Sequence, residues 1–338
     1  RDFQRSGMDM KRRNELGIRP LDALRKKIAT AKDAAALKTL IGELHRIGVG
    51  IFFGSGIGQD SKNSERYILH VAQDGLGMPE REYYLKDDAE SVRVRTAYLK
   101  HAEALFRLMG RTPAEAKAGT EALMRIETIL AKASMKKEDR RDPEKTYHKM
   151  TVAGLTKLSP ELDWKRYFTQ QGAEVKEVIV MQPDFLKAVS KLLDGTSLDD
   201  LKTYVEWHLV NDFAGLLSNA FVKQSFSFYG TALTGTKQMK PLWRRVLGNV
   251  NGHVGELLGQ IYVKKHFPAD AKRKMDILVD DLFTAYEARL KSLDWMTPPT
   301  KKKALKKLAA LNRKIGYPDK WKSYKGLVIT SEDYVGNV

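Results

Sequence analysis

Apolar residues recur every three or four positions along most of the chain, a spacing that places them on one face of a helix. One such stripe belongs to a helix that we expect to end at Gly110, and it comprises Val94, Tyr98, His101, Leu105 and Leu108. A longer stripe lies in a helix that begins after Pro268, and it comprises Met275, Val279, Leu282, Tyr286, Leu290 and Leu293. The pattern therefore predicts a mainly helical protein.

Capping signals predict where several of these helices begin and end. Thr112-Pro113-Ala114-Glu115 is a capping box with proline at the first helical position, and it predicts a helix from there to about Ser134. Charged residues 136–145 form a connector after it. Comparable signals predict helices over 183–195, 197–222 and 245–265, and a lysine-rich helix that begins at Thr297.

Two apolar stretches predict strands instead. Residues 48–53 and 67–71 flank a segment rich in turn-forming residues, which predicts a hairpin, and residues 178–181 predict one more short strand. The glycines at 54, 56 and 58 have the spacing of neither a dinucleotide fingerprint nor a P-loop, so they favour a hairpin loop over a phosphate-binding loop. The expected fold is mainly α, a multi-helical domain with one small β-hairpin.

Composition narrows the possible chemistry. Of the 338 residues 42% are apolar, enough for a sizeable core, and no apolar run has the length of a membrane-spanning helix. The absence of cysteine excludes disulfides, thiol nucleophiles and thiolate zinc sites. The chain opens without an initiator methionine, and we expect both of its ends to lie inside a longer protein.

The net charge of +17 is concentrated near the end of the chain. Residues 289–325 hold twelve lysines and arginines but only two acids, Asp294 and Asp319. This run could contact phosphates or an anionic surface. A solvated helix face is the better interpretation, because no nucleic-acid motif accompanies the lysines and because one apolar stripe lies opposite them: Ala304, Leu308, Leu311 and Ile315.

No histidine pair has the spacing of a zinc site. His208 and Asp212 lie four positions apart on one predicted helix, and a buried histidine bonded to that aspartate is a simpler interpretation than a metal site. His253 and Glu256 resemble half of a di-iron bundle motif, but no second copy of the pair occurs. We therefore predict no metal ligand and no catalytic residue in this chain, and its substrate-binding residues stay unknown.

The predicted helix over 245–265 carries a glycine face. Glycine weakens a helix, and its usual compensation is the close approach of another backbone. We therefore expect this helix to pack tightly against a neighbour. The glycines are Gly248, Gly252, Gly255 and Gly259, and a polar row beside them comprises Asn249, His253, Glu256 and Gln260.

Four groups of motifs, in order, resemble the neprilysin family of zinc metalloendopeptidases, which includes endothelin-converting enzyme and bacterial PepO. The first is Asp60-Ser61-Lys62-Asn63-Ser64 with Gly75-Leu76-Gly77-Met78-Pro79-Glu80-Arg81-Glu82-Tyr83-Tyr84, in which Met78 and Glu82 depart mildly from the family pattern. The second is Arg140-Arg141-Asp142-Pro143 with Tyr147-His148-Lys149-Met150-Thr151. The third is Tyr229-Gly230 and Leu233-Thr234-Gly235 with Trp243-Arg244-Arg245, and the fourth is Trp295-Met296 with Ile315-Gly316-Tyr317-Pro318-Asp319.

The resemblance implies an N-terminal region without chemistry of its own. In the family the zinc-binding HExxH motif, a downstream glutamate and a substrate-binding NAxY segment all follow the IGYPD region, so none falls within this chain. Residues 1–242 resemble the N-terminal helical lid domain, which caps the active-site chamber and restricts the size of substrates. Residues 243–338 resemble helices that join toward the thermolysin-like catalytic lobe, which the chain lacks.

The predicted function follows from this resemblance. The intact protein is expected to be a zinc metalloendopeptidase, with this chain inactive alone and the zinc ligands outside it. Its expected partners are the C-terminal catalytic half and peptide substrates, with no specific nucleic acid and no membrane span in this segment. Two alternatives are a standalone basic helical module for anionic partners and a scaffold without peptidase activity. The family resemblance implies a periplasmic or secreted protein, and the absence of cysteine favours a bacterial source.

Overall fold

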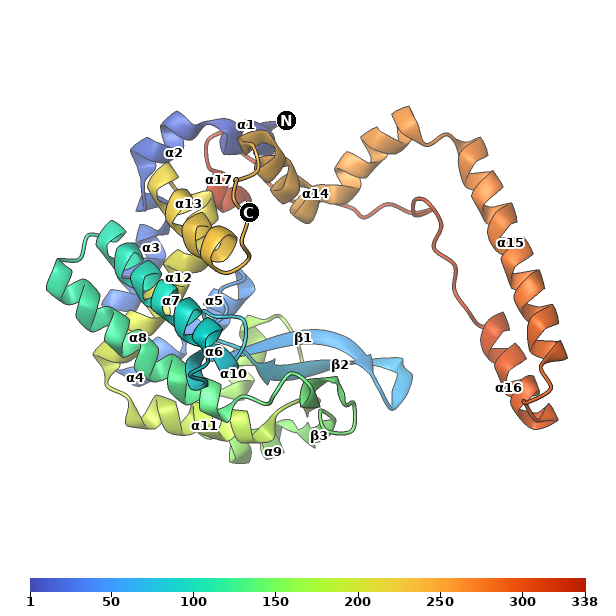
Figure 1. The fold of residues 1–338 in the computed structure, drawn as a ribbon, viewed down its shortest axis with the longest axis horizontal. Helices are drawn as coiled ribbons and strands as arrows, with labels where there is room; N and C mark the ends of the chain where they lie inside the picture. Colours follow the sequence, from blue (N-terminus) through green and yellow to red (C-terminus); the bar gives the residue numbers. More distant parts are fainter. The chain divides into compact units, whose positions relative to one another are not determined.

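The computed structural model describes residues 1–338, most of which lie in helices (Figure 1). The chain divides into two compact units: the larger unit comprises Asp9–Met239, and the smaller unit combines Arg1–Met8 with Lys240–Val338. One four-stranded sheet lies in the larger unit. The expected mainly α fold class is therefore confirmed. None of the helices combines the length and the apolar character that crossing a bilayer requires.

The larger unit begins with short helices and continues with longer ones. Its α-helices are α2 (Met10–Leu16), α3 (Asp22–Ala29), α4 (Ala34–Lys38), α5 (Leu40–Arg46), α6 (Glu82–Leu85), α7 (Ala89–Leu108), α8 (Pro113–Ala133), α9 (Val152–Leu158), α10 (Trp164–Gln170), α11 (Pro183–Gly195), α12 (Leu198–Phe213) and α13 (Asn219–Ser225). Single 3-10 turns occur at Arg19–Leu21, Asp139–Arg141 and Ala214–Leu216, and a π-helix of seven residues occurs at Phe226–Ala232.

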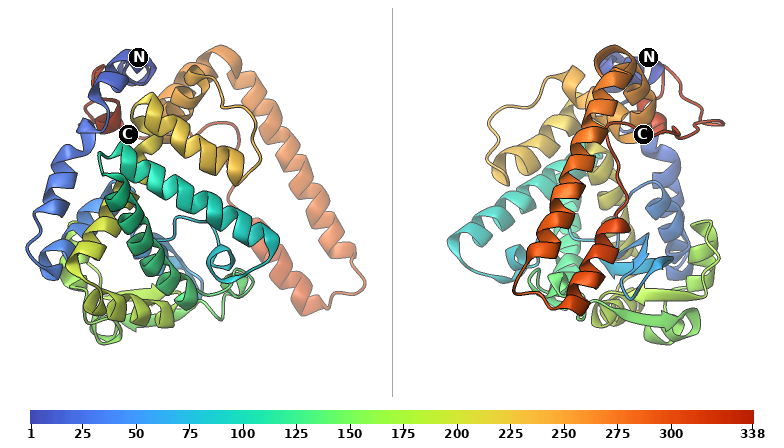
Figure 2. Two further views of the ribbon diagram at one scale, coloured as in Figure 1. Left: turned by 60° about the vertical axis from the view of Figure 1, so that its left-hand side comes forward. Right: turned by 90° about the vertical axis from the view of Figure 1, so that its right-hand side faces the viewer.

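The core of the larger unit lies where α7, α8 and α12 pack together, and Figure 2 shows α7 beside α8. Tyr98, Phe106, Tyr204 and Trp207 are fully buried there. The capping box predicted at Thr112 forms as expected. The backbone N–H of Glu115 donates to Thr112 Oγ1 at 3.3 Å, and that of Thr112 donates back to the Glu115 carboxylate at 2.8 Å. Local signals therefore determine where α8 begins.

The predicted helix over 197–222 is in fact two helices. The chain leaves α12 at Phe213 and begins α13 at Asn219. Arg13, which is buried, donates from its guanidinium to the carbonyl oxygens of Gly215 and Leu217 at 3.1 and 3.0 Å. Arg13 lies about 200 residues away in sequence, yet it satisfies the carbonyl groups at this break. Helical periodicity within the segment cannot reveal such a distant contact.

The sheet contains β1 (Phe53–Asp60), β2 (Asn63–Gln73), β3 (His148–Thr151) and β4 (Glu177–Val180), in the order β1-β2-β4-β3. β1 and β2 form the predicted hairpin, and β4 is the predicted short strand. β3, which pairs antiparallel with β4, was not predicted. The strand expected over 48–53 is wrong except at Phe53, the first residue of β1, because residues 48–52 are irregular chain. The glycines expected in a loop lie in β1 and pair with β2.

The smaller unit contains α1 (Asp2–Met8), α14 (Leu242–His266), α15 (Ala269–Ser292), α16 (Pro298–Ala309) and α17 (Tyr334–Asn337). Its small core joins both ends of the chain: Phe3 and Tyr334 are buried with their ring centroids 6.1 Å apart, and the Asn337 side-chain amide donates to Ser6 Oγ at 3.0 Å. α14 is interrupted at Val254, whose φ of −128° and ψ of 34° are not helical.

Candidate functional site

The first candidate pair, His208 and Asp212, separates in the structure. His208 is 2% exposed, and its Nε2 lies 2.9 Å from Oε1 of Glu127 on α8. Asp212 instead accepts the backbone N–H of Gly50 at 3.0 Å, and desolvation raises the pKa of its carboxyl. The prediction of a buried histidine is confirmed, but the prediction that Asp212 is its partner is wrong.

Glu127 is the centre of a buried polar network that the sequence analysis missed. Its carboxylate, which is fully buried, accepts hydrogen bonds from the Tyr84 hydroxyl at 2.8 Å and from the Gly77 backbone N–H at 3.0 Å. Tyr98 and His208 complete the shell around it. A carboxylate within the apolar stripe of α8, beside Leu123, Ile126 and Leu130, was the available signal, because an acid at a core position requires partners.

The tyrosines of this network stay protonated donors. Burial, followed by the nearby charge of Glu127, raises the pKa of Tyr84 and of Tyr98 well above the usual value. The Gly77 and Tyr84 donors to Glu127 lie in residues 75–84, so the network fixes this loop, which belongs to the first family motif.

Two glycines of that motif are required by this packing. Gly75 has φ of +84°, and a Cβ there would lie 2.5 Å from the backbone nitrogen of Phe52. A Cβ at Gly77 would overlap the Tyr98 hydroxyl. Both positions therefore exclude a side chain, which explains their place in the motif.

The hairpin tip, residues Asp60–Asn63, brings the first and second family motifs together. Asp60, which is 1% exposed, accepts the Lys62 backbone N–H at 3.0 Å and the Tyr147 hydroxyl at 2.9 Å, and Lys149 Nζ lies 3.3 Å from its second oxygen. The backbone hydrogen bond from Lys62 contributes most to lowering the pKa of Asp60, and Tyr147 and Lys149 add to it. These motif residues thus fasten the hairpin to β3.

The second candidate pair, His253 and Glu256, also fails to converge. His253 Nδ1 lies 2.9 Å from the carbonyl oxygen of Asn249, whereas Glu256 accepts the backbone N–H of Lys322 at 2.6 Å. Across the chain, no group of three or more histidines, aspartates and glutamates is close enough to hold a metal ion.

The glycine face of α14 is open within the smaller unit. A Cβ at Gly248 or Gly252 would meet no atom within 4 Å, and one at Gly259 would meet only the Trp321 ring at 3.4 Å. No backbone of the smaller unit makes the expected close approach to this face, so the packing predicted for the helix is not made within that unit.

The arm, which we define as residues 255–325, contains no buried residue. Its helices α15 and α16 lie side by side (Figure 2), and Lys301 Nζ donates to the carbonyl oxygen of Lys291 at 2.8 Å. Large apolar side chains of the arm face solvent, including Ile261 at 69% exposed, Tyr286 at 64% and Trp295 at 73%. α16 ends at Ala309, so Leu311 and Ile315 lie beyond the helix on which the apolar stripe was predicted.

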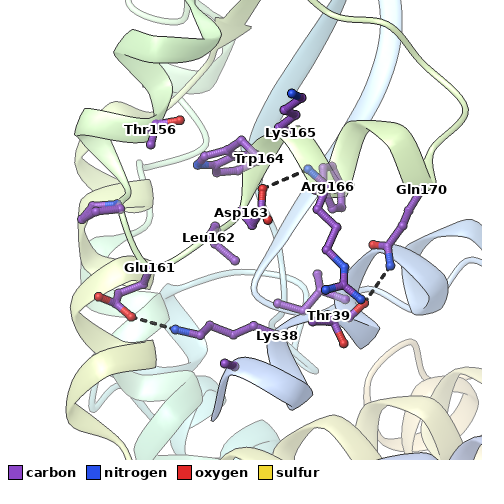
Figure 3. A pocket seen from close by; sticks show the side chains of 14 residues that line it. Lys38, Thr39, Thr156, Glu161, Leu162, Asp163, Trp164, Lys165, Arg166 and Gln170 are labelled. Carbon is purple, nitrogen blue, oxygen red and sulfur yellow. Dashed lines mark hydrogen bonds and ion pairs between the residues drawn. The ribbon is translucent and has the colours of Figure 1, made fainter.

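The larger unit also has a hollow of about 550 Å³ between α4–α5 and α9–α10 (Figure 3). Lys38 Nζ pairs with Glu161 across it at 2.7 Å, and the Gln170 side chain donates to the Thr39 carbonyl at 3.0 Å. Trp164, which lines it, is almost fully buried and donates from its indole to the Ser159 carbonyl.

Comparison with known proteins places these features in a family. The sequence model described as peptidase family M13, in its N-terminal form, matches residues 1–318. Endothelin-converting enzyme-like 1 of Mus musculus is 33% identical over 336 residues, which cover 94% of this chain and 43% of the relative. The chain thus spans less than half the length of the curated relatives it matches.

Solved structures agree with this result. The zinc metalloprotease ZMP1 of Mycobacterium tuberculosis, solved with an inhibitor, is 35% identical with a TM-score of 0.91, covering 99% of this chain and 51% of that one. PepO of Lactobacillus rhamnosis HN001 is 21% identical with a TM-score of 0.84, covering 99% of this chain and 54% of that one, and shows that the fold is shared. The resemblance drawn from the four motif groups is confirmed, and the chain belongs to the N-terminal region of peptidase family M13.

Proposed function

We propose that this chain is the N-terminal part of a zinc metalloendopeptidase that cleaves peptides and whose catalytic residues lie in a C-terminal part. In this proposal residues 1–242 form the helical lid that caps the active-site chamber and restricts substrates by size. Residues 243–338 join the lid toward the catalytic half. The intact enzyme acts outside the cytoplasm, in the periplasm or after secretion, as the family resemblance implies.

The open surface of the arm is the observation that carries this proposal. A folded chain does not normally leave two adjacent helices without any buried residue while their leucines, isoleucines and tyrosines face water. The open glycines of α14 point the same way, because their helical cost is normally offset by a closely packed neighbour. Since the chain spans 43% of the mouse relative, a C-terminal part of comparable size is the natural neighbour.

Zinc does not fit the residues of this chain. No group of three ligand side chains converges, and the two histidine–carboxylate pairs suggested by spacing have other partners. In the proposed enzyme the metal therefore belongs to the C-terminal part, and no step of the reaction is assigned to residues 1–338.

The larger unit has properties that suit a non-catalytic wall of the active-site chamber. Its buried polar network is fully paired, and it rigidly holds a loop with two glycines that tolerate no side chain. A rigid wall can exclude folded proteins by size while admitting flexible peptides.

The test supplies the two parts as separate polypeptides. Residues 1–338 alone should bind no stoichiometric zinc and cleave no fluorogenic peptide. Mixed with the C-terminal part of the same protein, they should form a stable complex. This complex should cleave short peptides in a chelator-sensitive manner but should not cleave a folded protein such as native ribonuclease. Zinc binding and chelator-sensitive turnover by residues 1–338 alone would overturn the proposal.

A matched pair of variants locates the interface. Leu282→Lys, at a side chain of α15 that is 57% exposed, should abolish complex formation without changing the stability of the isolated chain. Ile129→Lys on α8, 44% exposed and in the larger unit, should leave the complex intact. Equal binding by both variants would remove the arm from the interface. If the arm binds polyanions tightly but does not bind the C-terminal part, the alternative of a basic binding module would be favoured.

A further inference from the structure

β1 lies at an edge of the sheet and pairs on one side only. The sheet order is β1-β2-β4-β3, and each residue of β1 from Phe53 to Gln59 is matched to a residue of β2 in antiparallel register. An edge strand presents a row of backbone N–H and C=O groups that can pair with another extended chain. Figure 1 shows β1 beside β2 in the long hairpin.

This edge lacks the features by which proteins normally prevent such pairing. From Phe53 to Gln59 it carries no charged residue and no proline, although charges and prolines are the usual protection. The opposite edge, β3, is only four residues long and bears Lys149. The two edges of one sheet therefore differ, and only β1 is long and unprotected.

The middle of β1 is accessible. Ser55, Gly56 and Ile57 are exposed, and the Ile57 side chain is 70% exposed. Ile57 also lines a hollow of about 410 Å³, together with Tyr67 and Leu69 of β2. In an added strand, the residue opposite Ile57 would point its side chain to the same face of the sheet, next to this hollow. An apolar side chain would cover the exposed isoleucine there.

From the edge, its lack of charge and the hollow, we propose that β1 binds an extended peptide segment by strand addition, with an apolar side chain of the peptide opposite Ile57. Backbone hydrogen bonds supply the affinity in this mode, and side-chain pockets supply the preference. That the segment is a peptide substrate of the intact enzyme rests on the proposed function. The binding edge itself belongs to this chain alone.

The experiment measures fluorescence anisotropy of a fluorescein-labelled peptide of alternating valine and threonine, flanked by lysines, with the 338-residue chain. A set of single N-methylations along the peptide then tests the geometry. In an added strand the N–H groups alternate between β1 and solvent, so methylation at every second position should abolish binding and methylation at the positions between should not. Uniform effects of methylation, or no binding, would overturn the proposal.

Variants locate the site on the protein. Ile57→Lys places a protecting charge in the middle of β1 at an exposed position, and it should weaken binding by roughly tenfold or more. Ile129→Lys on α8 makes the same exchange at an exposed isoleucine away from the sheet and should leave the affinity unchanged. Equal affinities of the two variants would contradict the proposal. Dimerisation of the chain that Ile57→Lys abolishes, without peptide binding, would assign the edge to a second copy instead.

This test is independent of the catalytic half. Loss of peptide binding with intact assembly of the two parts would remove the edge site and leave the proposed function standing. Peptide binding by a chain that fails to assemble with the C-terminal part would support the edge site and contradict the proposed function.

Discussion

The imidazole Nε2 of His208 lies 2.9 Å from the carboxylate Oε1 of Glu127, and both side chains are shielded from solvent. The two residues lie on different helices, α12 and α8, so their contact ties together the centre of the larger unit. Tyr84 and Tyr98 share the same carboxylate, which links this contact to the loop of residues 75–84.

Replacing the central carboxylate should destabilise the larger unit strongly. Glu127→Gln puts an amide that donates hydrogen bonds where the Tyr84, Tyr98, Gly77 and His208 donors converge, and we expect a loss of about 3 kcal/mol in the free energy of unfolding. Glu121→Gln, at an exposed position of the same helix, should change it by less than about 0.5 kcal/mol. Urea unfolding followed by circular dichroism measures both, and equal values would show that the network is not stabilising.

Replacing Gly75 and Gly110 by alanine distinguishes the cost of backbone strain from the cost of steric overlap. Both have positive φ, 84° and 95°, but a Cβ at Gly110 meets no atom within 4 Å. Gly110→Ala should therefore cost about 1 kcal/mol from conformation alone, whereas Gly75→Ala should cost roughly 3 kcal/mol or more because of the overlap with Phe52. Thermal unfolding of both variants tests the difference, and similar losses would contradict the close packing of Gly75.

The hairpin tip should lose stability in acid through Asp60. The pKa of Asp60 is lowered in the folded chain by the backbone N–H of Lys62, by Tyr147 and by Lys149. Its contribution is complete above the ordinary value of 3.8 and is lost as the pH falls through the lower folded pKa. Asp60→Asn should therefore be less stable than the parent chain at pH 6, and the difference should shrink as the pH falls below 3.8 and through the lower folded pKa.

Hydrogen exchange of the β1 and β2 amides, measured from pH 6 downward, checks this pH dependence. Asp199→Asn, at an exposed position in the first turn of α12, serves as the matched control and should follow the parent chain. A stability difference for Asp60→Asn that stays constant across this range would exclude the titration of Asp60 as its cause.

The isolated chain should self-associate through its arm. Exposed apolar side chains on α15, among them Leu278, Leu282 and Tyr286, have no cover within the smaller unit. Sedimentation velocity should show concentration-dependent assembly that Leu282→Lys reduces and Ile129→Lys does not. A monomer at all concentrations whose arm resists limited proteolysis as well as the larger unit does would contradict the interface assigned to residues 243–338.

Binding of nucleic acids should be weak and insensitive to sequence. The lysines of α16 are Lys301, Lys302, Lys303, Lys306 and Lys307, and they provide charge without a base-reading motif. Any affinity for DNA or RNA should fall steeply between 50 and 200 mM salt, because it comes from the release of counterions. Fluorescence titration at two salt concentrations measures it, and sequence-dependent binding at the higher one would support the alternative of a basic binding module.

The sequence by itself determined the helices whose ends are marked locally. The capping box at Thr112, the proline at 183 and the glycine at 110 act through atoms within a few residues, so the end of α7 and the bounds of α8 and α11 could be predicted closely. The ordered family motifs likewise identified the family, because they can be read without any three-dimensional contact.

Only the tertiary structure decided the pairings between distant segments. β3 has four residues and exists because β4 lies beside it, and β1 runs through glycines because β2 continues the ladder. Glu127, not Asp212, holds His208 because α8 packs on α12. Likewise, the exposure of the arm's apolar side chains can be seen only once the rest of the chain has been placed around them. A periodic pattern shows which face of a segment is apolar, but its partner depends on packing between residues far apart in the chain.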